Sequence, residues 1–150
     1  MIAVLLRWLL AIALVWAALG KLANPHEFYT AILAYQLPLS PAITRTAAIV
    51  LPWLELLTGL LLAANLRRDG ALIWALALFS AFTIATAQAW LRGLNISCGC
   101  LDLRIIGIQP GSSLAHTLET PAFAAIRAAL FTAAAFSLLR RKAPARPPTI

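Results

Sequence analysis

Two cysteines, Cys98 and Cys100, are the residues whose type and spacing most clearly suggest chemistry in this sequence. They are the only thiols in the chain, and one residue, Gly99, separates them. Glycine adopts backbone angles that other residues avoid, so a disulfide can close within this short segment. So tight a ring is expected to be strained, and strained disulfides are the more oxidising and labile ones. The pair therefore predicts a site that cycles between dithiol and disulfide.

Two other interpretations of the cysteine pair stay open. Two thiolates can bind a soft metal ion such as Cu(I) or the mercuric ion, with further ligands supplied from elsewhere. The imidazoles of the chain are those of His26 and His116. Alternatively, the disulfide is a structural clip, although it would constrain very little of the chain. Because the chain has no third cysteine, thiol-disulfide exchange would require a cysteine of a partner protein.

Three charged residues, Lys21, Glu55 and Arg127, lie in or at the end of long apolar runs. An unpaired charge inside a bilayer costs several kcal/mol, so we expect these residues to pair or to face a water-filled cavity. They are predicted to form a supporting polar pocket on the same side of the membrane as the cysteines, where a nearby cation lowers the pKa of a thiol. The alternative is an ion pair that only fixes the register of the helices.

The elements that position these residues follow from the composition. The chain has 150 residues, of which 62% are hydrophobic and 11% charged. This excludes an ordinary soluble enzyme, and it also excludes disorder. Four apolar runs are long enough to cross a bilayer. We therefore predict an all-α membrane protein, a four-transmembrane-helix bundle over residues 1–142, followed by a disordered, Pro-rich tail at 143–150. The expected spans are about 2–22, 47–64, 71–91 and 122–139.

The basic residues predict the orientation of the bundle. Seven of the twelve fall on the side of the two termini, and the opposite loops are long and sparsely basic. The positive-inside rule therefore places both termini in the cytoplasm, and the loop with Cys98 and Cys100 on the outer side of the membrane. The net charge of +7 does not indicate nucleic-acid binding, because the basic residues punctuate apolar runs instead of sharing one polar face.

A short helix is predicted in the first outer loop. Asn24 is a suitable cap, and Pro25 suits the first helical position. The apolar stripe Phe28, Ile32 and Leu33 then favours a helix that lies on the membrane surface.

Several short motifs together resemble the methylamine utilisation protein MauE family, within the broader DoxX-like group of four-span membrane proteins. Their order and spacing carry the resemblance over most of the chain, and one departure is Leu101-Asp102, where the family often has Phe-Gly. The matching pieces are Gly20-Lys21, Asn24-Pro25 and Phe28; Leu51-Pro52 with Glu55 and Gly59; Cys98-Gly99-Cys100; and Arg127.

The resemblance implies a membrane component that acts with a thioredoxin-like partner in the maturation of disulfide-containing periplasmic proteins, of the methylamine dehydrogenase type. Cys98 and Cys100 would then be the catalytic residues of a thiol-disulfide oxidoreductase, and electrons would pass to a quinone or to a second protein. The alternatives are a non-enzymatic scaffold or small subunit of a membrane complex, and soft-metal handling at the cysteine pair.

Overall fold

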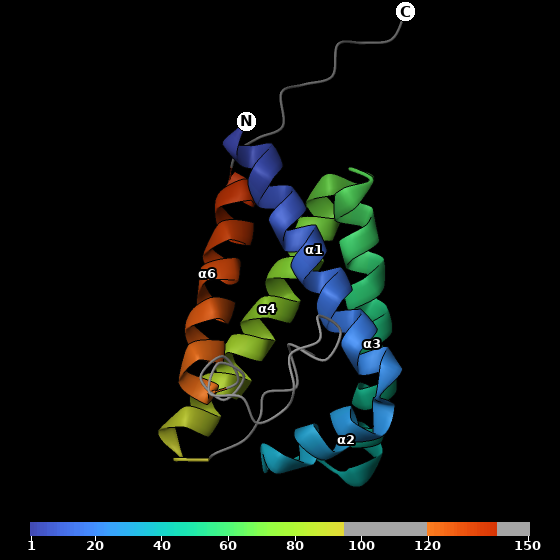
Figure 1. Cartoon of the computed structure of the whole chain (residues 1–150), viewed down its shortest axis with the longest axis vertical. Helices are drawn as coiled ribbons and strands as arrows, with labels where there is room; N and C mark the ends of the chain where they lie inside the picture. The colour runs from blue at the N-terminus through green and yellow to red at the C-terminus, as the bar shows by residue number, and fades with distance from the viewer. Residues whose placement is uncertain (95–119, 141–150) are drawn as a thin grey trace, which may run out of the picture.

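The computed structural model of the chain describes residues 1–94 and 120–140, and this part is built of helices without strands (Figure 1). Cys98, Cys100 and His116 lie outside the described residues, as does the predicted tail at 143–150. The helices are α1 (Ile2–Ala23), α2 (Pro25–Ala34), α3 (Pro41–Ala63), α4 (Arg68–Leu91) and α6 (Pro121–Arg140).

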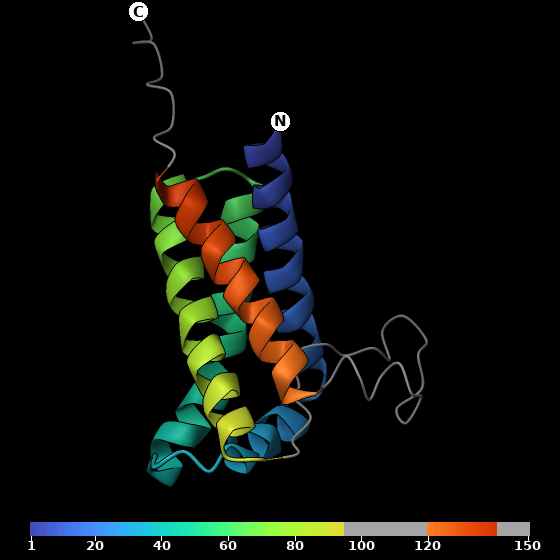
Figure 2. The ribbon, with the colours of Figure 1, turned by 90° about the vertical axis from the view of Figure 1, so that its left-hand side faces the viewer.

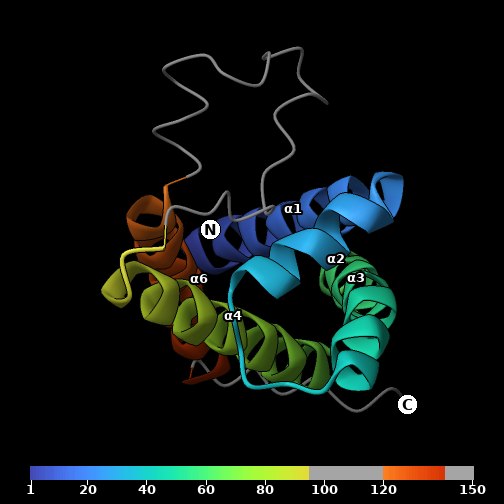
Figure 3. The same ribbon diagram turned by 90° about the horizontal axis from the view of Figure 1, so that it is seen from below.

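Four of these helices, α1, α3, α4 and α6, are long and apolar enough to cross a membrane. The predicted all-α bundle with four candidate spans is therefore confirmed. The start of α1 and the end of α6 lie at the same end of the bundle (Figure 2). Helix α2 lies across the opposite end (Figure 3). Which end faces the cytoplasm stays a prediction, as does the placement of α2 at the membrane surface.

The core of the bundle is apolar and receives side chains from all four long helices. Leu10, Leu62, Leu72 and Leu138, one from each of these helices, are almost completely buried. Alanines fill the space between them, which lets the helix backbones approach closely. Many large apolar side chains point outward instead, as lipid contact requires.

Helix α3 begins at Pro41, earlier than the predicted start of the second span at Ala47. The cause is a local N-cap that hydropathy does not detect. Ser40 Oγ accepts a hydrogen bond from the backbone N–H of Ile43, at 3.4 Å, and Pro41 occupies the first turn. The helix thus extends beyond the apolar run and reaches the level of α2 (Figure 1).

Helix α3 packs closely against α1 at Gly59. A Cβ atom at this position would lie 2.8 Å from Val15 Cγ2 and 3.1 Å from the carbonyl oxygen of Ala11. Because one of these neighbours is backbone, the clash cannot be relieved by a side-chain rotation alone. Gly59 therefore sets the spacing of α1 and α3, the two helices that carry Lys21 and Glu55.

A Gly59→Ala variant is expected to be less stable than a Gly70→Ala variant by about 1–3 kcal/mol, the usual cost of overpacking. Gly70 lies in α4, and a Cβ atom added there would meet no atom within 4 Å, so alanine gains helix propensity without a clash. Thermal unfolding of both variants in detergent measures the difference. Equal midpoints would show that α1 and α3 are not held at this distance.

Candidate functional site

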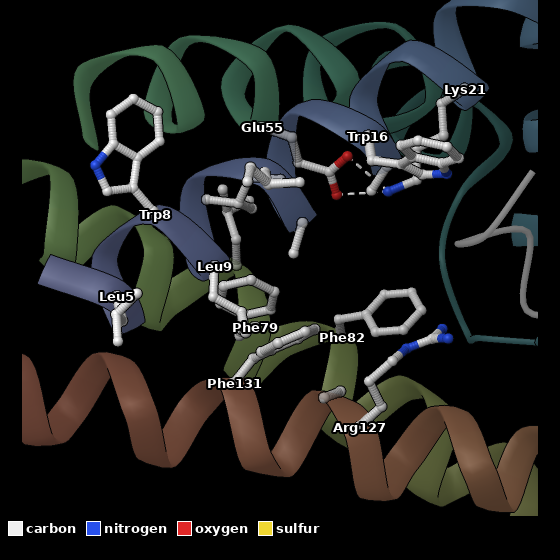
Figure 4. A pocket seen from close by; sticks show the side chains of 16 residues that line it. Leu5, Trp8, Leu9, Trp16, Lys21, Glu55, Phe79, Phe82, Arg127 and Phe131 are labelled. Atoms are coloured by element: carbon white, nitrogen blue, oxygen red, sulfur yellow. Dashed lines mark hydrogen bonds and ion pairs between the residues drawn. The ribbon is translucent and has the colours of Figure 1, made fainter. Parts of the chain in front are cut away.

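A buried ion pair joins α1 to α3. Lys21 Nζ lies 2.5 Å from Glu55 Oε1 and donates a second hydrogen bond to Oε2, at 2.7 Å (Figure 4). Lys21 is only 4% exposed, and the Glu55 side chain is 12% exposed. Two charges at this burial are stable only because each compensates the other.

Two aromatic rings complete the surroundings of the Lys21 ammonium group. Nζ lies 4.9 Å from the ring centroid of Phe28, on α2, and 5.8 Å from that of Phe82, on α4. Both distances fall within the range of a cation–π interaction. Lys21 lies near the end of α1 and contacts one residue on each of α2, α3 and α4. This side chain therefore connects four helices.

A cavity of about 680 Å³ opens beside the ion pair, between α1, α4 and α6. Lys21, Glu55 and Arg127 all line it, so the three charged residues predicted to converge do lie around one cavity. Figure 4 shows Leu5 and Trp8 at the far end from these charged groups, and the rings of Phe79 and Phe131 along one wall. The cavity is therefore charged at one end and apolar along the rest of its length.

The charged end lies near the end of α1 and part-way along α3. At 1.5 Å per residue, Glu55 is about 21 Å along the helix axis from Pro41 and about 12 Å from Ala63. Lys21 is about 3 Å along the axis of α1 from its last residue, Ala23. The ion pair therefore joins the end of α1, against which α2 packs, to the interior of α3.

The threonines near the cavity are satisfied by the helices themselves. Thr83 Oγ1 donates to the carbonyl oxygen of Phe79, at 2.7 Å, and Thr86 Oγ1 donates to that of Phe82, at 2.8 Å. Thr83 and Thr132 also share a hydrogen bond between α4 and α6, with 3.3 Å between the hydroxyl oxygens. These hydroxyls hold the helices together, and none of these three threonines lines the cavity.

A second polar contact lies at the end of the bundle where α2 packs. Arg92, which follows α4, donates one hydrogen bond to the backbone oxygen of Gln36 and another to its side-chain oxygen, at 3.2 and 3.1 Å. This contact ties the end of α4 to the segment after α2. The chain continues from there, past Leu94, toward Cys98 and Cys100, which are outside the described residues.

Sequence reasoning missed most of the aromatic part of the site. Trp16, Phe82 and Phe131 line the cavity together with the predicted charged residues. Phe28, which the sequence placed in an apolar stripe on the membrane surface, contacts Lys21. Spanning helices also carry aromatic residues on their lipid-facing sides, as Trp53 and Trp74 do here. No sequence signal separates the two groups, because the difference is made by the way the helices pack.

Two comparisons with known proteins point to the same family. The family model described as "Methylamine utilisation protein MauE" matches residues 1–141. A curated relative, "Methylamine utilization protein MauE" of Paracoccus denitrificans, is 36% identical over 96 residues, which are 63% of this chain and 51% of the relative. The match thus spans about half the length of that relative. No solved structure matches the chain.

Proposed function

This chain belongs to the MauE family, and from that premise we propose that it is a membrane component of a thiol-disulfide exchange pathway that matures disulfide-containing periplasmic proteins. The family name implies a role in methylamine utilisation. The observation that carries the proposal is the Cys98-Gly99-Cys100 sequence, which holds every thiol of the chain.

The exchange proceeds in two balanced steps. The thiolate of one cysteine attacks a disulfide of a thioredoxin-like partner, forms a mixed disulfide and displaces one partner thiolate. The second cysteine then attacks the mixed disulfide and displaces the other partner sulfur. This chain becomes the disulfide and the partner becomes the dithiol. The reverse sequence oxidises the partner, and the two reduction potentials set the direction.

Lys21, Glu55 and Arg127 have a supporting role in this proposal. Together they carry one net positive charge, and they line one cavity. Positive charge favours a thiolate over a thiol, and the thiolate is the species that attacks a disulfide. Lys21 contacts Phe28 of α2, and this contact supports a location for the exchange at the end of the bundle that α2 covers.

The proposed location is a bacterial inner membrane, with the cysteine loop on the periplasmic side. Four apolar helices support a multi-pass membrane protein. The described ends of the bundle, Ile2 and Arg140, lie on the same side of it, and the predicted cytoplasmic residues Arg7, Arg67 and Arg68 belong to that side by sequence (Figure 2).

The proposal predicts a two-electron redox transition in the purified full-length chain. In glutathione buffers of graded potential, Cys98 and Cys100 are expected to become unreactive toward maleimide together on oxidation, and reactive again on reduction. The midpoint should be more oxidising than about −300 mV, because structural disulfides lie below that potential. A Cys98→Ser variant is the control and should show no intramolecular transition. Thiols that stay alkylatable in every buffer, or a disulfide that resists glutathione, would contradict the proposal.

A further inference from the structure

The cavity beside Lys21 is much larger than an ion pair requires. Its volume of about 680 Å³ lies within the range of small-molecule sites, about 300–1,000 Å³. Apolar and aromatic side chains form most of its wall, among them Leu9, Phe79 and Phe131. A ligand that fits this shape has one small polar head and a long apolar remainder.

The charged end offers hydrogen-bond donors in excess of acceptors. Two hydrogen bonds from Lys21 Nζ go to Glu55, and an ammonium group has three N–H bonds. Trp16 Nε1 is buried and has no hydrogen-bond partner in the part of the chain that the structure describes. Arg127 adds a second cation at the same cavity. The ligand head should therefore accept hydrogen bonds and need not donate any.

We propose that this cavity binds an isoprenoid quinone. The quinone ring is flat and suits the aromatic wall around Phe82, and its carbonyl oxygens accept hydrogen bonds from Trp16 and Lys21. The isoprenoid tail then runs along the apolar part of the cavity toward Leu5 and Trp8 (Figure 4).

The Glu55 carboxylate favours a quinone over a phospholipid. A phosphate bound at Lys21 would lie beside this carboxylate, which already accepts two hydrogen bonds from Lys21 Nζ, and the two anions would repel each other. Acyl chains bear no hydrogen-bond acceptor and would leave Trp16 Nε1 without a partner. A quinone head is neutral and accepts hydrogen bonds, so it avoids both costs.

When the exchange runs in the direction that oxidises the partner, this chain is left as the dithiol, and bound quinone would be its electron acceptor. Cys98 and Cys100 then lose two electrons and two protons to form their disulfide, and the quinone takes up both electrons and both protons to become a quinol. This redox step rests on the proposed function. Binding of the quinone does not, because every residue assigned to the site belongs to the helical bundle.

The test is calorimetric titration of the purified chain in detergent with ubiquinone-2. A Trp16→Phe variant keeps the ring but loses the N–H donor, and its Kd is expected to rise about 2- to 10-fold, as for the loss of one hydrogen bond. An Ala17→Phe variant places a large side chain at the cavity wall, and its Kd should rise at least about tenfold. Trp53→Phe and Ala81→Phe, at exposed positions outside the cavity, are the matched controls and should bind like the parent.

Unchanged binding in both cavity variants would overturn the proposal, as would equal competition by phosphatidylethanolamine, which would identify a lipid site. A Cys98→Ser/Cys100→Ser variant separates this proposal from the exchange chemistry. It is expected to bind ubiquinone-2 with the parent Kd, and loss of binding in that variant would contradict a site confined to the helices.

Discussion

Maturation of the disulfide-containing periplasmic substrate protein is expected to fall to the level of cells that lack this protein when both Cys98 and Cys100 are replaced by serine. A serine hydroxyl cannot form a disulfide, so neither the attack nor the resolving step can occur. The yield of correctly oxidised substrate, followed on non-reducing gels in cells that carry the variant, measures the effect.

A Ser97→Ala variant is the matched control for the cysteine replacements, because it changes a neighbouring residue and leaves both thiols in place. It is expected to mature the substrate normally. If the double cysteine variant did the same, the exchange chemistry would be wrong, and the bundle would act as a scaffold.

Breaking the ion pair between α1 and α3 is expected to cause the largest loss of stability. A Glu55→Gln variant leaves the Lys21 ammonium group buried without its carboxylate, and removal of one partner from a buried pair costs about 3–5 kcal/mol. A Lys21→Met/Glu55→Leu variant removes both charges, and it should recover most of that loss. Unfolding of the parent, of Lys21→Met, of Glu55→Leu and of the double variant in detergent measures the coupling energy.

Asp69→Asn is the control for the charge change, because Asp69 is exposed in the first turn of α4. Its effect should stay within about 1 kcal/mol, the usual size of a charge effect at a helix end. If Glu55→Gln were no more destabilising than Asp69→Asn, the pair would not hold α1 against α3 as the structure indicates.

The four spans could be predicted from sequence because lipid contact requires long apolar runs, and such runs are visible in a single chain. The start of α3 could not be predicted from hydropathy. Ser40 and Pro41 begin the helix by capping, in a stretch that is too polar to be read as part of a span.

The gathering of Lys21, Glu55 and Arg127 was also predictable, because charges in apolar helices must find compensation. The direct pairing of Lys21 with Glu55 was not. It depends on the register of α1 against α3, which includes the close approach at Gly59. Such packing contacts leave no separate pattern in the sequence.

Trapping of a mixed disulfide tests the exchange chemistry most directly. Cys98→Ser and Cys100→Ser variants, each keeping one thiol, are expressed in cells, quenched with acid and alkylated, and the attached protein is identified by mass spectrometry. The account predicts that one of the two variants accumulates a disulfide-linked adduct with a thioredoxin-like protein, which a reductant releases. If neither variant forms an adduct while the parent protein is active, Cys98 and Cys100 do not exchange disulfides with a partner.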